Sequence, residues 1–156
     1  MQYTVGEVVE IKGIGLHSGV DSVLKIEPAP ENTGIIFKRS DIQNSKPIRG
    51  IFSNVVDTRN CTCLGDGTAN VVSTIEPLMS VLFILGIDNA IVSVNNPEIP
   101  ILDGSGRVFY NVISKVSKIK QNSPRKYLKV KKEIVFEDGK GASVWNEFEK
   151  RPGVMR

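Results

Sequence analysis

The stretch V-S-T-I-E-P-L-M-S-V-L-F-I-L-G, residues 72–86, decides the fold of this chain. It predicts one helix, with Ser73 and Glu76 as a capping box at its start and Gly86 directly after its end. Few positions in it are polar, so the helix is expected to be buried. Pro77 is expected to remove the first intrahelical hydrogen bond, and its replacement to stabilise the helix by roughly 1 kcal/mol. A carboxylate beside a helix defect is where chemistry is expected first.

Length and composition indicate a globular protein of one domain with a short appendage. The chain has 156 residues, of which 40% are hydrophobic and 24% are charged, which favours a packed core over disorder. The net charge of +3 is too small to indicate nucleic-acid binding. No apolar run reaches the roughly 18 residues of a membrane span, and the N-terminus lacks the pattern of a signal peptide. These features predict a cytoplasmic protein with no membrane span.

Short strands are predicted on both sides of the central helix, and a second amphipathic helix follows them. The expected strands are residues 3–12, 20–26, 34–37, 48–56, 61–64, 69–72 and 90–94, and the second helix covers residues 108–116. This order predicts an α+β fold, a two-layer sandwich in which a small, mainly antiparallel sheet packs against two helices.

The polar stretch K-Q-N-S-P-R near residue 120 is the best linker in the sequence. It divides the chain into a first domain at residues 1–119, a linker at residues 120–126, and residues 127–156. The last part shows alternating strand patterns without a helix to cover them, and such strands do not form a domain alone. It is therefore predicted to be the truncated start of a second domain.

The two cysteines, Cys61 and Cys63, form a C-x-C pair. In a strand this spacing places both thiols on one face, and a disulfide between them would be strained. No histidine lies near them in the sequence, so they do not predict a zinc site. Two small buried residues in a reducing compartment are the favoured interpretation.

Four stretches together resemble a known family. They are G-I-G-L-H-S-G at 13–19, V-V-D-T-R-N-C-T-C-L at 55–64, V-S-T-I-E-P-L-M at 72–79 and N-P-E-I-P-I-L-D-G-S at 96–105. In this order and spacing they resemble the N-terminal domain of the UDP-3-O-acyl-N-acetylglucosamine deacetylases, zinc enzymes of lipid A biosynthesis in Gram-negative bacteria. The resemblance covers residues 2–140. It implies two similar α+β domains with the active site between them.

The resemblance also implies a chemistry for the start of the central helix. Glu76 matches the general base, which takes a proton from a zinc-bound water as that water attacks the acetamide of the UDP-linked, 3-O-acylated N-acetylglucosamine. Pro77 stands where the family has a histidine that binds zinc. The family's other ligands, a histidine and an aspartate, come from the second domain and have no counterpart here. For Glu76 the alternative role is the carboxylate of the capping box.

Three further residues match positions near the family's cleft, each with a structural alternative. His17 is the single histidine of the chain, and it could equally be an exposed turn residue. Cys63 matches a cysteine that lines the cleft, but a buried core thiol is favoured. Asp103 matches the segment that borders the site, and capping of the second helix is slightly favoured.

Proline at position 77 and the absence of second-domain ligands predict a truncated, substituted relative that does not catalyse deacetylation alone and holds no zinc. Two alternatives stay open. The chain could be a non-catalytic domain that binds a UDP-sugar or a partner, or it could be one half of a split deacetylase whose second domain is a separate chain.

Overall fold

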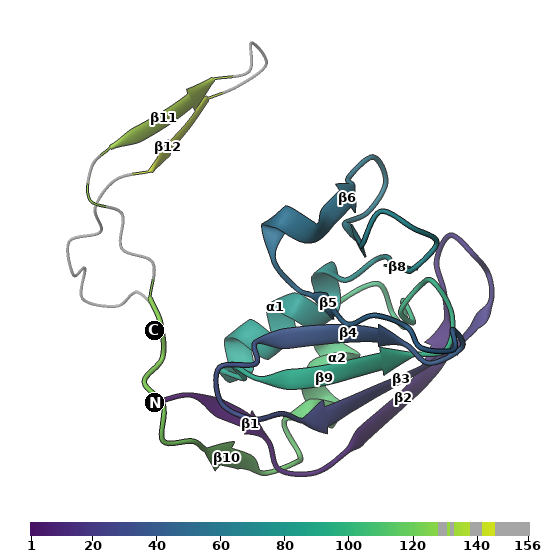
Figure 1. Ribbon diagram of the computed structural model, residues 1–156, viewed down its shortest axis with the longest axis horizontal. Helices are drawn as coiled ribbons and strands as arrows, with labels where there is room; N and C mark the ends of the chain where they lie inside the picture. Colours follow the sequence, from purple (N-terminus) through teal and green to yellow (C-terminus); the bar gives the residue numbers. More distant parts are fainter. Residues whose placement is uncertain (128–130, 132, 138–141, 146–156) are drawn as a thin grey trace. The chain divides into compact units, whose positions relative to one another are not determined.

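The computed structural model describes residues 1–127, 131, 133–137 and 142–145, and the chain divides into two compact units, residues 1–125 and 126–156 (Figure 1). In the second unit, β11 (Ile134–Glu137) pairs antiparallel with β12 (Ala142–Trp145). The remaining residues predicted for the start of a second domain lie largely outside the described ones. The predicted domain boundaries therefore stay predictions.

A five-stranded sheet forms one layer of the first unit. Its strands, in spatial order, are β2 (Val9–Ile14), β3 (Asp21–Pro28), β9 (Ala90–Val94), β4 (Ile35–Arg39) and β5 (Ile48–Arg49). All neighbours are antiparallel except β4 and β9, which run parallel. Alternate residues of β3 are buried, because successive side chains of a strand point to opposite faces. The mainly antiparallel sheet predicted from the sequence is confirmed.

Two helices, α1 (Glu76–Leu85) and α2 (Arg107–Ile113), cover one face of this sheet (Figure 1). Leu78 and Leu82 of α1 and Phe109 of α2 are buried in the same hydrophobic core as the inward-facing residues of the strands. This arrangement is the predicted two-layer α+β sandwich. Gly86 ends α1 with a φ of 68°, a left-handed conformation that glycine adopts without strain, as the sequence predicts.

The start of α1 differs from the prediction. The helix begins at Glu76 with Ile75 as its N-cap, and no side chain caps it. The Ser73 hydroxyl instead donates to the Pro97 carbonyl at 2.9 Å, and the Ser73 N–H donates to the same carbonyl at 2.8 Å. The predicted capping box is therefore wrong, because the Ser73 hydroxyl bonds to a residue distant in sequence instead of to the first turn of the helix.

Pro77 is the second residue of the helix and breaks no hydrogen bond. The first four N–H groups of a helix have no acceptor within it, so the missing N–H of proline costs little there. The helical ladder starts with the Met79 N–H, which donates to the Ile75 carbonyl at 2.9 Å. The Ser73 carbonyl, the acceptor for residue 77 in a longer helix, accepts the Ile99 N–H at 3.3 Å. The predicted helix defect at Pro77 is wrong.

The expectation that α1 is buried all round is also wrong. Leu78, Val81 and Leu82 face the core, whereas Phe83 is 84% exposed and Ile84 is 68% exposed. One side of the helix packs on the sheet, and the apolar residues of the opposite side remain at the surface of the described structure.

Smaller elements complete the first unit. They are β1 (Tyr3–Val5), paired with β10 (Lys118–Lys120), and the sheet of β6 (Val55–Asp57), β7 (Cys63–Gly65) and β8 (Val71–Val72), preceded by the 3-10 turn Phe52–Asn54. The single strands predicted at residues 3–12 and 48–56 are thus each divided into two. Backbone bonds between Gln2 and residues 121 and 123 continue the β1–β10 pairing, so this part of the predicted linker is held against the N-terminus.

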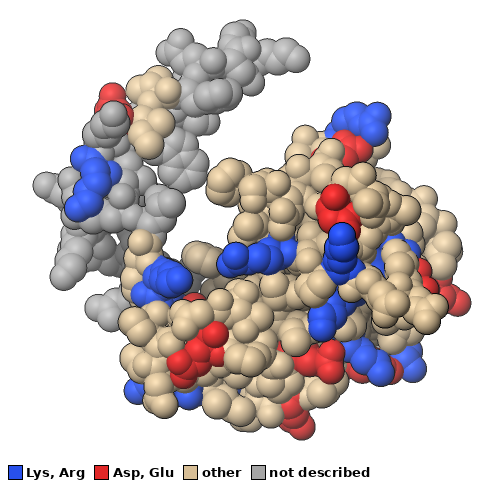
Figure 2. Space-filling view, in the orientation of Figure 1, with Lys and Arg blue, Asp and Glu red and all other residues tan. Residues whose placement is uncertain are grey.

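Charges of both signs are interspersed over the face shown in Figure 2. The described residues on that face form no broad patch of one sign. This distribution agrees with the small net charge of +3. Neither described helix is long and apolar enough to be a candidate membrane span.

Candidate functional site

Glu76, the first residue of α1, lies at the surface, where the structure joins it to the segment before β7. Its carboxylate accepts a hydrogen bond from the Thr62 N–H. A carboxylate in the first turn is also stabilised by the helix dipole. Glu76 is therefore an accessible carboxylate with a fixed orientation, and the predicted role in a capping box does not describe it.

Cys61 and Cys63 flank Thr62, and both are partly exposed rather than buried as favoured from the sequence. Their Sγ atoms lie 3.6 Å apart. Burial of its thiol, the hydrogen bond with Cys61 and the nearby carboxylates of Asp57 and Glu76 raise the pKa of Cys63 to about 11. Cys63 is thus a protonated thiol at neutral pH, close to the Glu76 carboxylate.

The turn that carries His17 is held by a buried carboxylate, Glu98, which is 2% exposed. The His17 N–H lies 3.1 Å from both carboxylate oxygens, and the Ser18 N–H donates to one of them at 2.9 Å. Gly15 makes room for this contact, since a Cβ there would lie 2.5 Å from Oε2 of Glu98. His17 itself is exposed, and its backbone is fixed from inside the protein.

The same carboxylate reaches the segment that enters α1. The Thr74 hydroxyl donates to Glu98 at 2.8 Å. Thr74 has a φ of 60°, a left-handed conformation that is costly for a β-branched residue. The hydrogen bond to Glu98 helps to hold this conformation, so one buried carboxylate connects the His17 turn with the start of α1.

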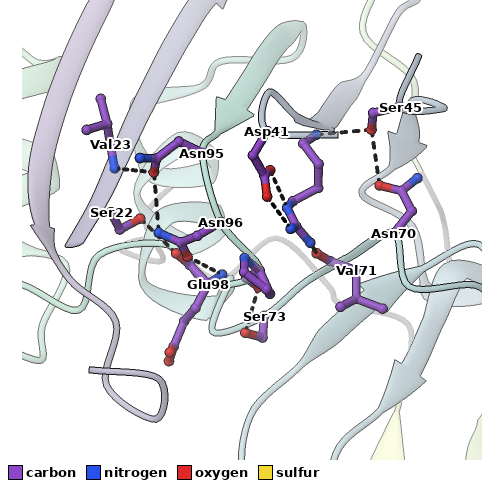
Figure 3. A network of polar contacts seen from close by, with 12 residues as sticks. Ser22, Val23, Asp41, Ser45, Asn70, Val71, Ser73, Asn95, Asn96 and Glu98 are labelled. Atoms are coloured by element: carbon purple, nitrogen blue, oxygen red, sulfur yellow. Dashed lines mark hydrogen bonds and ion pairs between the residues drawn. The ribbon is translucent and has the colours of Figure 1, made fainter. Parts of the chain in front are cut away.

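The backbone around Glu98 is equally well anchored (Figure 3). The Ser22 hydroxyl donates to the Glu98 carbonyl at 2.7 Å, and the Glu98 N–H donates to Oδ1 of Asn96 at 2.8 Å. Burial alone raises the pKa of the Glu98 carboxyl, but the hydrogen bonds from His17, Ser18 and Thr74 outweigh it, so the pKa lies below its ordinary value of 4.5. Glu98 is therefore ionised at neutral pH.

Asp103 lies in the turn before α2. Its carboxylate accepts from the Ser105 N–H at 3.1 Å and pairs with the Arg107 guanidinium at 3.0 Å. These contacts hold its pKa below the ordinary value. The N-cap of α2 is Gly106, so Asp103 organises the preceding turn. The capping of the second helix by Asp103, which the sequence favoured, is therefore wrong.

The predicted site residues belong to segments that converge on the first turn of α1. Cys63 is connected to Glu76 through Thr62, and the His17 backbone is connected to Thr74 through Glu98. The turn of Asp103 also approaches, because a Cβ on Gly106 would lie 3.7 Å from the Pro77 carbonyl oxygen.

Glu98 is the residue that the sequence reasoning missed. The signal was available in the run N-P-E-I-P, where a carboxylate stands between apolar and proline residues in a segment with little other polarity. A charged residue in such a segment needs buried partners, because an unpaired buried charge is very costly. The structure supplies them from the turn 15–18 and from Thr74.

The donors of the described residues do not fit a metal centre with three protein ligands. Within the described residues no group of three or more His, Cys, Asp or Glu side chains lies close enough to hold a metal ion. Pro77 contributes no donor atom next to Glu76, and the His17 turn is fixed through its backbone. A zinc site of three protein ligands therefore has no counterpart in the described part of the chain.

The fold and the site define an α+β domain that presents an oriented carboxylate at the start of a helix. The model of the UDP-3-O-acyl N-acetylglycosamine deacetylase family matches residues 2–150. The chain belongs to this family. The resemblance drawn from the four sequence stretches is thereby confirmed.

Curated relatives agree with this assignment. The chain is 45% identical over 138 residues to the UDP-3-O-acyl-N-acetylglucosamine deacetylase of Shewanella violacea, which is 88% of this chain and 45% of that protein. It is 43% identical to the enzyme of the same name from Wolinella succinogenes, with the same coverage. The enzyme of that name from Brucella melitensis biotype 2 is 36% identical over 153 residues, 98% of this chain and 52% of that protein. The chain spans about half the length of these relatives.

Proposed function

We propose that this chain is a substituted relative of the deacetylase, related to the half that carries the general base, and that it does not hydrolyse UDP-3-O-acyl-N-acetylglucosamine by itself. The observation that carries the proposal is Pro77. It directly follows Glu76 in the first turn of α1, where the resemblance implies a zinc-binding histidine. Its ring has no atom that could bind a metal.

The part of the chemistry that fits this chain is that of Glu76. Its carboxylate is exposed, lies at the positive end of the helix dipole and is oriented by the Thr62 N–H. Such a group can accept a proton from a water or orient one. The exposed His17 turn and the turn of Asp103 approach the same helix start and would border a bound sugar. The described residues form no group of three or more His, Cys, Asp or Glu side chains that could hold a metal ion, so we expect no stoichiometric zinc.

Metal analysis and an acetate-release assay with UDP-3-O-acyl-N-acetylglucosamine and added zinc test this proposal. We expect neither bound zinc nor acetate above the rate without protein, both for the natural chain and for Pro77→His. The matched control is Glu76→Gln, which removes the candidate base and keeps the side-chain volume. About one zinc per chain, together with acetate release that Glu76→Gln abolishes, would overturn the proposal.

A second candidate is one half of a split deacetylase, and the exposed Phe83 and Ile84 on α1 favour it. Apolar side chains of this size are often covered by a partner. The test mixes this chain with the C-terminal half of the Shewanella violacea relative and measures acetate release. Acetate release by the mixture with the natural chain would support this candidate. Acetate release only by the mixture with the Pro77→His variant would show that Pro77 prevents the split enzyme from working. Binding of UDP-N-acetylglucosamine without any acetate release would favour a non-catalytic binding domain.

A further inference from the structure

The pair Cys61 and Cys63 is a cluster of nucleophilic side chains to which the proposed function gives no role. These are the two cysteines of the chain, both free and both partly exposed. Their Sγ atoms are 3.6 Å apart and point at each other closely enough for a hydrogen bond. A disulfide bond is about 2.0 Å long, so the two sulfur atoms need to approach by roughly 1.6 Å.

The local backbone allows such an approach. Cys63 begins β7, whereas Cys61 lies in the irregular segment before it. The pairing of β6 with β7 is also irregular at this point, since the register shifts between Val55 and Asp57. Cys61 is therefore free of the strand ladder that fixes Cys63, and movement at Cys61 can bring the sulfur atoms together.

We propose that Cys61 and Cys63 form a reversible oxidation site, which a low-molecular-weight disulfide converts into an intramolecular disulfide. The Cys61 thiolate attacks one sulfur of the reagent, forms a mixed disulfide and displaces one thiolate. The Cys63 thiolate then attacks the Cys61 sulfur, forms the bond between the two cysteines and displaces the second thiolate. The protein loses two electrons and two protons, which convert the reagent into two thiols.

The charges around the pair explain this order of attack. Cys63 keeps its proton at neutral pH, because burial, the bond with Cys61 and the carboxylates of Asp57 and Glu76 raise its pKa to about 11. Arg59 is the nearby cation, but its guanidinium is paired with Asp57 at 2.8 Å. Cys61 therefore supplies the first nucleophile, and ring closure by Cys63 accelerates as the pH rises, by roughly tenfold per unit.

Oxidation would change the contact of Glu76. Thr62 is the one residue between the two cysteines, so the new ring contains its backbone. The ring cannot close without reorienting the Thr62 peptide, whose N–H donates to the Glu76 carboxylate. Strained disulfides of this kind are easily reduced, which makes the change reversible. Its consequence for the proposed role of Glu76 rests on the proposed function, whereas the oxidation site does not.

The experiment treats the full chain with oxidised glutathione in mildly alkaline buffer and follows intact mass and free thiols. We expect loss of two hydrogen atoms and of both thiols, with full recovery after a dithiol reductant. Cys63→Ser should stop at a protein–glutathione adduct, and Cys61→Ser should react much more slowly, because Cys63 keeps its proton at this pH. The amide signal of Thr62 should shift on oxidation of the natural chain and return to its original position after the dithiol reductant.

Three outcomes would overturn the proposal. One is a glutathione adduct of the natural chain that never closes, and another is a disulfide-linked dimer in its place. The third comes from the chain unfolded in urea as a reference. If the unfolded chain forms the intramolecular disulfide as readily as the folded chain at the same glutathione ratio, the fold contributes nothing to the site. None of these outcomes depends on deacetylase activity, so failure here is distinct from failure of the proposed function.

Discussion

Replacing Glu98 by glutamine tests whether one buried carboxylate holds the His17 turn against the start of α1. The substitution keeps the size of the side chain, but it exchanges an oxygen acceptor for an NH2 donor. The carboxylate accepts three donors, the N–H groups of His17 and Ser18 and the hydroxyl of Thr74. A single amide oxygen cannot serve all three, and its NH2 group then faces another donor.

The expected cost follows from these contacts. A hydrogen bond to a charged group contributes about 1.5–3 kcal/mol, and a buried donor left without an acceptor costs about 1–3 kcal/mol. We therefore expect Glu98→Gln to lower the free energy of unfolding by about 2–3 kcal/mol. For a unit of this size that corresponds to a decrease in Tm of roughly 10 °C.

The pH dependence separates loss of the charge from a general packing defect. The pKa of Glu98 is lowered in the folded protein, so the unfolded chain binds this proton more tightly than the folded one. The stabilisation from the ionised carboxylate is complete above the unfolded value near 4.5 and is lost as the pH falls through the lower folded pKa. The difference between the natural chain and Glu98→Gln should be constant at neutral pH and shrink in acid.

Denaturant unfolding at several pH values measures these quantities, with Glu10→Gln as the matched control. Glu10 is an exposed carboxylate that pairs with Lys12 and Lys25 at the surface, so its substitution should leave the unfolding midpoint nearly unchanged. Equal midpoints for the Glu98 and Glu10 variants would refute the reasoning. A Glu98 effect that stays constant down to strongly acid pH would show that packing, not charge, causes it.

Two further substitutions probe the ends of α1. Pro77→His should lower the free energy of unfolding by about 0.5–1 kcal/mol, because the unfolded chain gains freedom while the helix gains no hydrogen bond. Denaturant unfolding measures this change. A clear increase in the free energy of unfolding would show that the helix starts before Glu76. Gly86→Ala should lower the stability of the protein by about 1 kcal/mol, because Gly86 has a φ of 68° and a Cβ there would lie 3.1 Å from the Arg125 guanidinium. Thermal unfolding measures this loss, and an unchanged Tm would contradict it. Ser80→Ala on the exposed side of α1 is the control for both, with little change expected.

Periodicity predicted the elements whose stability comes from the core. The apolar spacing of α1 and the alternation of β9 gave the layers correctly, and Gly86 gave the end of the helix, because these signals depend on local geometry. The exposed side of α1 was missed, since an apolar residue looks the same in sequence whether or not a neighbour covers it. Phe83 and Ile84 show this limit.

The start of α1 was mispredicted because a tertiary contact competes with a local one. Ser73 and Glu76 have the spacing of a capping box, but both donors of Ser73, its hydroxyl and its N–H, bond to the Pro97 carbonyl. Glu76 in turn receives the Thr62 N–H. Contacts with residues 14 or more positions away in the sequence replace both halves of the box. The left-handed Thr74 between them has no local signal, because the partner that helps to hold it, Glu98, is distant in sequence.

Position 77 shows how the fold and the proposed chemistry are separated in this domain. In the first turn of α1 the residue needs no N–H, so proline fits the helix without loss of a hydrogen bond. The buried residues of α1 begin with Leu78, one position later, whereas Pro77 is only half-buried. With proline at this position the core, the Thr74–Glu98 contact and the Thr62 contact that orients Glu76 are all present. It follows that a stable, well-folded product is not evidence for activity, and that acetate release has to be measured directly.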